Sequence, residues 1–187
     1  MRILTHKIVG GCFAVGALSL AYDNMIDLPM QLNAVNNAAM FAGTILGSGL
    51  PDIDHPKSHI GSKFFFLSHF IEKVSRLSSR IGGKYSGHRG PIHTPIVNLM
   101  LYMALFYVGE LLSLGSMYQA VILGISIGFA SHLIADFLNP KGIMIFYPVF
   151  KSRISLIGFK SGTGDVLAVL LFVPLTMAIV MKKYMIF

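Results

Sequence analysis

The sequence predicts an all-α membrane protein, a polytopic bundle of about five transmembrane or membrane-embedded helices with one amphipathic helix at the interface. Of its 187 residues, 54% are hydrophobic and 12% are charged, which is about half the charged fraction of a soluble domain. The hydrophobic residues also gather in runs of helical length with polar segments between them. A chain of this length without repeats is typical of one domain, so we treat residues 1–187 as a single domain.

The first two apolar runs cover residues 8–22 and 34–50. Residues 8–22 follow a short basic start and are somewhat short against the roughly 20 residues that a bilayer requires. They fit either a secretory signal peptide or a first membrane helix. In the second run, Gly43 and Gly47 are four residues apart, a spacing of small residues that lets two membrane helices approach closely.

The third and fourth runs, 96–115 and 117–138, are separated by a tight turn, so we expect antiparallel neighbouring helices. The segment Gly124–Gly128 matches the G-x-S-x-G pattern of serine hydrolases, which requires a turn between a strand and a helix. Here the pattern lies inside an apolar helix and predicts close helix packing instead. The last run, 166–181, predicts a fifth helix.

The polar segment 51–95 holds seven basic and three acidic residues. Within it, apolar side chains recur at helical spacing from Lys63 to Ile81, which predicts an amphipathic helix at the membrane interface. If the amino terminus lies in the cytoplasm, 13 of the 15 Lys and Arg residues are cytoplasmic, in agreement with the positive-inside rule. Orientation in a membrane therefore accounts for the net charge of +7, and no aromatic-basic patch indicates nucleic acid binding.

Histidines and aspartates gather at the predicted cytoplasmic face. The chain has only eight acidic residues, and two of them stand in the segment Pro51–Pro56. His88 and His93 flank a turn, and His132 and Asp136 are four residues apart, so the latter pair shares a helix face. Ionisable residues in membrane helices are costly and usually serve a site. We therefore predict a divalent metal site with eight candidate ligands: His6, Asp52, Asp54, His55, His88, His93, His132 and Asp136.

Two interpretations without a metal stay open. His132 and Asp136 can form a structural hydrogen bond, and Asp52 and Asp54 can be solvated acids at a helix end. For a metal, nitrogen and oxygen ligands without thiolate suit Zn²⁺, with Mn²⁺ or Fe²⁺ as alternatives, and the single Cys12 lies in an apolar run. Two ions about 4 Å apart are common in sites that cut phosphoesters, and Asp52 is suited to bridge them.

Several motifs together resemble the YdjM family of bacterial inner-membrane proteins, described as membrane-bound metal-dependent hydrolases. The resemblance covers most of the chain and implies an inner-membrane location. A match near the start also favours a retained first helix over a cleaved signal. Family members often carry Glu after a Gly-rich turn near the end, where this chain has Asp165. The motifs are Thr5-His6, Leu50-Pro51-Asp52-Ile53-Asp54-His55-Pro56, Gly87-His88-Arg89-Gly90 through His93-Thr94, His132-x-x-x-Asp136 and Pro140-Lys141-Gly142 to Pro148.

The family is also distantly similar to zinc-dependent phospholipase C and single-strand nucleases, which implies a multi-zinc site for phosphoester hydrolysis. We therefore expect a multi-pass inner-membrane hydrolase with a metal site that faces the cytoplasm and a phospholipid or related membrane substrate. Asp54 would bind metal or act as general base, and Arg89 would hold an anionic substrate. Two other classes stay open: a metal or proton transporter, with ionisable groups at mid-membrane depth, and a non-catalytic scaffold with a closed structural metal site.

Overall fold

The protein is all-α, as predicted. The structure is a computed structural model that describes residues 3–55, 58–63, 65–66, 68–73, 90–150, 152–156 and 163–185. Among these residues the only β-pairing is a single antiparallel bridge between Ile143 and Ile154. The named elements are α1 (Ile3–Tyr22), α2 (Ala34–Gly47), the 3-10 helix η1 (Leu50–Asp54), α3 (His59–Lys63), α5 (Pro95–Leu111), α6 (Ser116–Phe137) and α7 (Thr163–Met185).

All five predicted apolar helices form, as α1, α2, α5, α6 and α7. Within the described part of the chain, three helical stretches are long and apolar enough to cross a membrane: Ile3–Tyr22, Ser116–Phe137 and Gly164–Lys182. The helix α5 is apolar but shorter, and α2 has 14 residues. A bilayer core requires about 20 residues of helix, so α2 and α5 are the shorter members of the bundle.

Some helices begin or end at residues other than the ends of the predicted apolar runs. The helix α1 begins at Ile3, so His6 lies inside its first turns and not in a preceding tail. The helix α2 ends at Gly47, and residues 50–54 form η1, in which Pro51 stands near the start. Proline has no N–H to donate to the preceding turn, which explains why α2 does not extend to Leu50. The helix α7 begins at Thr163 and therefore includes Asp165.

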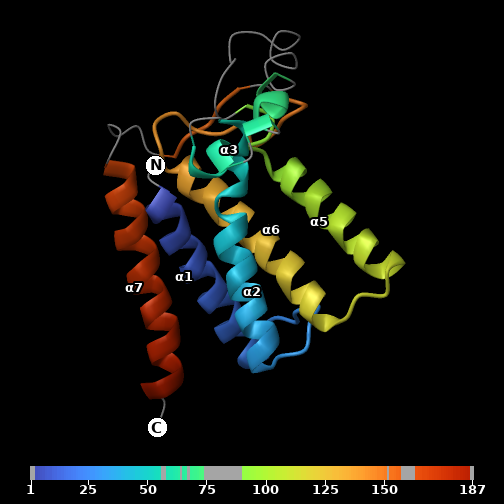
Figure 1. Cartoon of the computed structure of the whole chain (residues 1–187). Coiled ribbons are helices and arrows are strands. Elements are labelled where there is room, and N and C mark those ends of the chain that lie inside the picture. The colour runs from blue at the N-terminus through green and yellow to red at the C-terminus, as the bar shows by residue number, and fades with distance from the viewer. Residues whose placement is uncertain are drawn as a thin grey trace.

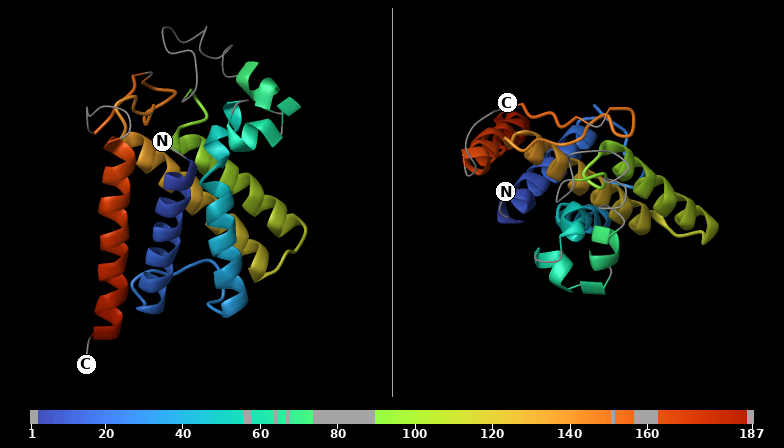
Figure 2. Two further views of the ribbon diagram at one scale, coloured as in Figure 1. Left: turned by 60° about the vertical axis from the view of Figure 1, so that its left-hand side comes forward. Right: turned by 90° about the horizontal axis from the view of Figure 1, so that it is seen from above.

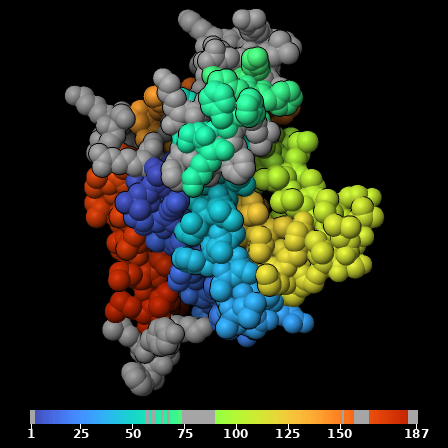
Figure 3. Space-filling model, viewed as in Figure 1, coloured from blue at the N-terminus to red at the C-terminus, as the bar shows by residue number. Residues whose placement is uncertain are grey.

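The bundle is arranged around α6. Figure 1 and both views of Figure 2 show α6 crossing the middle, with α1 and α2 on one side and α5 on the other, while α7 lies along α1. In the space-filling view of Figure 3, α2 is flanked by α1 and α6. The amino terminus, η1 and the carboxyl end of α6 meet at one end of the bundle, and the carboxyl terminus lies at the other (Figure 1). Segments far apart in sequence thus converge.

Small residues bring the backbones of α2 and α6 into direct contact. A Cβ atom added at Gly43 or Gly47 would collide with the carbonyl oxygens of Val121 or Ile125 in α6. The reverse also holds, because a Cβ at Gly124 or Gly128 would collide with carbonyl oxygens of α2. The predicted packing role of both glycine pairs is confirmed, and the G-x-S-x-G segment is a helix-packing surface.

The predicted amphipathic helix 63–81 is described only in part. Residues 65–66 and 68–73 are helical, and two side chains of the predicted apolar face, Phe66 and Phe70, are exposed. Residues 74–81 lie outside the described residues, so the interfacial position of this segment stays a prediction.

Candidate metal centre

Five of the eight predicted ligands gather at the end of the bundle where the segments converge. They come from α1, η1, the turn before α5, and α6. Four of them have 0–2% of their surface exposed, and Asp52 alone is partly open, with an exposed side-chain fraction of 18%. Burying so many ionisable groups is costly unless they are paired or bind a metal. The five residues are His6, Asp52, His93, His132 and Asp136.

The spacing of the ligand atoms fits a shared ion better than hydrogen bonds. Nε2 of His132 lies 3.6 Å from Oδ1 of Asp52 and 3.5 Å from Oδ2 of Asp136. Nε2 of His93 lies 3.7 Å and 3.9 Å from the same two oxygens. These distances exceed the N–H···O range of about 2.7–3.2 Å. Four ligands placed tetrahedrally at about 2.1 Å from Zn²⁺ are about 3.4 Å apart, close to the observed separations.

His6 adds a further ligand on the other side of Asp136. Its Nε2 lies 3.8 Å from Oδ1 of Asp136, while Oδ2 faces the other two histidines. The His6 ring stacks on that of His132, with 3.7 Å between ring centroids. His6, Asp52 and His132 form one group that can hold an ion, and His93, His132 and Asp136 form another. The two groups have His132 in common, so the arrangement has ligands for one ion or for more than one.

The orientation of His132 is set by α2. Its Nδ1 donates to the backbone carbonyl of Ser48 over 2.7 Å, so the lone pair is on Nε2, which faces the cluster. Ser48 caps the carboxyl end of α2, where carbonyls have no partner within the helix. The sequence alone does not predict a role for Ser48; its position directly after Gly47 of the close-packed glycine pair is the signal that points to it.

His93 is positioned by a turn and by Asp54. The backbone N–H of His93 donates to the Gly90 carbonyl over 3.0 Å, and the Thr94 hydroxyl donates to the Pro91 carbonyl over 2.8 Å. Oδ2 of Asp54 lies 3.5 Å from Nδ1 of His93, on the side of the ring that faces away from Asp52 and Asp136. Asp54 thus stands where an orienting carboxylate stands beside a metal-binding histidine.

Burial and neighbouring charges prepare Asp52 and His93 as ligands. For Asp52, burial favours the neutral acid, but the interaction with the nearby His93 ring and the fields of His132 and His6 outweigh burial and lower the pKa. For His93, burial lowers the pKa below 6.5, and this outweighs the opposing effect of Asp52 and Asp54. An ionised carboxylate and a neutral imidazole are the forms that bind metal.

Two nitrogens of the cluster indicate a missing partner. Within the described part of the chain, Nε2 of His132 and Nδ1 of His6 are buried and make no hydrogen bond. Buried polar atoms nearly always have a partner in native proteins. For Nε2 of His132, which faces two carboxylates at ion-sharing distance, a divalent cation is the partner that fits.

The other predicted residues stand apart from this cluster or outside the described residues. His55 is half-buried at the end of η1 and belongs to neither group of candidate ligands. His88 and Arg89 lie outside the described residues. Asp165 lies in the first turn of α7 and lines a pocket of about 470 Å³ with Thr5, the neighbour of His6.

Comparison with known proteins identifies related membrane proteins. The family model described as YdjM inner membrane protein matches residues 1–186. "Inner membrane protein YdjM" of Escherichia coli (strain K12) is 33% identical over 105 residues, which cover 56% of this chain and 46% of that protein. The match to YdjM of Shigella flexneri has the same extent. This chain thus spans about half the length of these two relatives.

A further relative extends over most of both chains. It is "Uncharacterized protein YvsG" of Bacillus subtilis (strain 168), which is 30% identical over 150 residues, or 79% of this chain and 80% of that protein. No solved structure matches the chain.

Proposed function

Because this chain belongs to the YdjM family of inner membrane proteins, we propose that it is a membrane-embedded, metal-dependent hydrolase of phosphoester bonds. The observation that carries the proposal is the buried cluster of three histidines and two aspartates with ion-sharing distances. These ligands contain no thiolate, which suits Zn²⁺, with Mn²⁺ or Fe²⁺ as alternatives. A divalent ion bound here would lower the pKa of a water molecule and polarise a phosphoryl oxygen.

The residues of the cluster have distinct roles in this proposal. His93, His132, Asp52 and Asp136 would hold the ion, and His6 would be a further ligand to it or to a second ion. Asp54 would be a positioning residue, because its Oδ2 lies 3.5 Å from Nδ1 of His93, where its charge would keep Nε2 of that ring turned to the other ligands. Arg89, proposed to hold the anionic substrate, follows His88 in the segment outside the described residues.

The partial exposure of Asp52 supports a catalytic site over a closed structural one. A structural metal site has all its positions filled by protein, whereas a catalytic site keeps one open to water or substrate. Asp52 is the ligand with an exposed side-chain fraction of 18%, so the open side of the ion would lie at η1. Substrate would then approach from the end of the bundle, where lipid headgroups meet water.

A transporter fits the geometry less well. A pathway across the membrane needs ionisable groups at several depths. In the described residues, the candidate ligands lie in the first turns of α1, in η1, and in the last turns of α6, all at one end of the bundle.

The proposal is tested by metal analysis and a hydrolysis screen. Purified protein is expected to carry at least one equivalent of Zn²⁺, and His132→Ala is expected to lose it together with hydrolysis of phosphodiester or phospholipid substrates. His69→Ala removes a histidine outside the cluster and should change neither. Metal-free wild-type protein after exposure to Zn²⁺, Mn²⁺ and Fe²⁺ would contradict the metal site. Stoichiometric metal without hydrolysis of any screened phosphoester would favour the structural alternative.

A further inference from the structure

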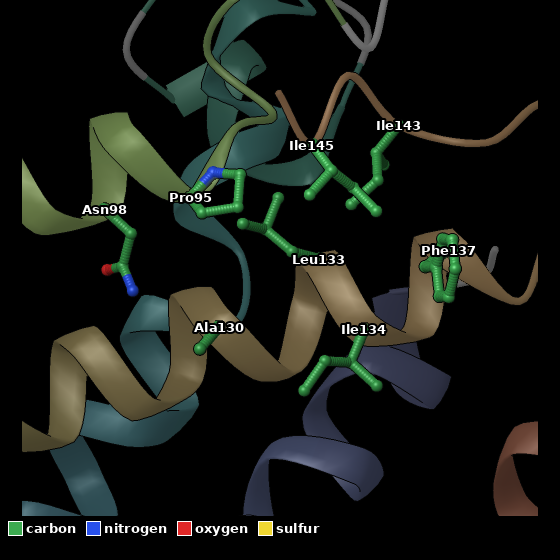
Figure 4. A pocket seen from close by; sticks show the side chains of 8 residues that line it. All are labelled: Pro95, Asn98, Ala130, Leu133, Ile134, Phe137, Ile143 and Ile145. Atoms are coloured by element: carbon green, nitrogen blue, oxygen red, sulfur yellow. The ribbon is translucent and has the colours of Figure 1, made fainter. Parts of the chain in front are cut away.

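A pocket of about 220 Å³ lies between α5, the last two turns of α6 and the loop that follows, near the end of α6 that carries His132 and Asp136. Figure 4 shows its side chains converging from these three segments, with Pro95 and Asn98 from α5 and Ile143 and Ile145 from the loop. The loop wall is held in place, because Ile143 and Ile154 exchange two backbone hydrogen bonds of 3.0 Å. The position of the loop wall of the pocket is therefore fixed by backbone hydrogen bonds.

The walls of the pocket suit a hydrocarbon. Seven of its eight lining residues are apolar. The exception, Asn98, already donates to the Ser126 carbonyl at 3.2 Å and accepts from the Ser126 hydroxyl at 3.3 Å. Apolar cavities of about 150 Å³ stay dry and bind benzene or xenon. A cavity of about 220 Å³ has room for a larger apolar group.

The helices around the pocket are apolar, as expected for surfaces that face lipid. The walls of the pocket include α6, which is long and apolar enough to cross a membrane, and α5, whose Leu99 and Met103 are more than half exposed. A ligand that enters from this side comes from the bilayer. Lys141, two residues before Ile143, is exposed at the same end, so an anionic headgroup above the pocket would meet a positive charge.

The pocket and the candidate ligands occupy the same turns of α6, on different sides of the helix. On α6, Leu133 follows His132 and Phe137 follows Asp136, within a stretch of about 10 Å along the helix axis. Leu133 and Ile143 also pack in a cluster with Leu50, the first residue of η1. A lipid whose chain fills the pocket would thus carry its phosphate at the end of the bundle where the ligands lie.

We propose that this pocket binds one acyl chain of an anionic membrane phospholipid and so presents its phosphoester to the metal site. Only the second part, presentation of the phosphoester to the metal site, rests on the proposed function, because binding of the acyl chain requires no metal. Ala130 lines the pocket on α6, and a larger side chain there would take the place of the lipid.

The test uses phosphatidylglycerol with a diazirine near the end of one acyl chain, added to the full chain in detergent micelles. Photolabelling followed by peptide mass spectrometry is expected to mark residues 130–137 and 143–145. Ala130→Phe should reduce this labelling about tenfold, because it excludes about two methylene groups. Ala104→Phe makes the same change on the exposed face of α5 and should leave labelling unaltered. If Ala130→Phe does not fold, Ala130→Leu serves in its place.

The outcomes separate the pocket from the enzyme. Labelling spread evenly over α5 and α7, or unchanged in Ala130→Phe, would overturn the pocket even if the protein hydrolyses phosphoesters. Labelling that persists in Asp136→Asn and disappears in Ala130→Phe would support the pocket even if the hydrolysis screen is negative. If the pocket binds lipid and the protein also hydrolyses phosphoesters, Ala130→Phe should slow hydrolysis of long-chain lipid and leave hydrolysis of a water-soluble phosphodiester unchanged.

Discussion

At the scale of the residue, two of the three buried histidines of the cluster, His93 and His132, are held by different partners. The Ser48 carbonyl accepts the Nδ1 proton of His132, and the Asp54 carboxylate faces Nδ1 of His93. Both contacts leave Nε2 as the nitrogen turned to the aspartates. Because each orientation depends on a partner outside the ligand shell, metal affinity should respond to changes at residues that never contact the ion.

Asp54→Asn is therefore expected to weaken metal binding by about 10- to 100-fold without abolishing it. The asparagine retains an oxygen near His93 but lacks the negative charge that holds the Nδ1 proton. Competition with a chromogenic chelator measures the affinity, and the absorption bands of the Co²⁺-substituted protein report the geometry. Asp27→Asn, on the exposed link before α2, is the matched control. Loss of metal as complete as in Asp136→Asn would show that Asp54 is itself a ligand.

The charge states of Asp52 and His93 predict a particular pH dependence. Burial lowers the pKa of His93 below 6.5, so the ring is neutral at pH 7, and protons compete with metal only at lower pH. Asp52 stays ionised throughout, because its pKa is also lowered. Metal should be retained at neutral pH and lost on acidification, once protons compete for the His93 ring. Equilibrium dialysis from neutral to acidic pH measures retention, and release on raising the pH from 6.5 to 7.5 would contradict this assignment.

At the scale of the element, the contact between α2 and α6 determines whether the site can form. Gly47 packs on the backbone of Ile125, and the next residue, Ser48, supplies the carbonyl to His132. A side chain at Gly47 would push the helices apart and separate Ser48 from His132. Helix packing and metal binding are thus coupled through two adjacent residues.

Gly47→Ala is expected to destabilise the fold by about 1–3 kcal/mol through overpacking and to weaken metal binding together with it. Thermal unfolding in detergent and metal titration measure the two effects. Gly16→Ala in α1 is the matched control, because a Cβ there meets nothing within 4 Å, and the better helix propensity of Ala should leave stability equal or higher. Equal melting temperatures for the two variants would disprove close packing at Gly47.

At the scale of the whole molecule, the basic segments and the candidate metal ligands lie at the same end of the bundle. The described parts of the basic segments 51–95 and 139–164 lie at the end of the bundle that holds the cluster, whereas the links 23–33 and 112–115 lie at the other end (Figure 1). If the positive-inside rule holds for this chain, the candidate metal ligands face the cytoplasm, which is the orientation that we propose.

Cysteine accessibility tests this orientation. With Cys12, the single cysteine, replaced by serine, Asp27→Cys and Lys141→Cys place one exposed thiol at each end of the bundle. A membrane-impermeant maleimide is expected to label Asp27→Cys in spheroplasts and Lys141→Cys only after lysis. The reverse pattern would turn the metal site to the periplasm.

The sequence by itself determined the all-α membrane character, the positions of five apolar helices and the segments that carry the site. It did so because hydrophobic runs, charge bias and glycine spacing are local patterns that lipid and backbone geometry translate directly into helices. Only the tertiary structure decided which atoms face one another. It brought His6, Asp52, His93, His132 and Asp136 together, set Asp54 behind His93, and revealed the role of Ser48. Those relations depend on the close approach of α2 to α6 and on the rotation of each helix about its axis, which no local pattern specifies.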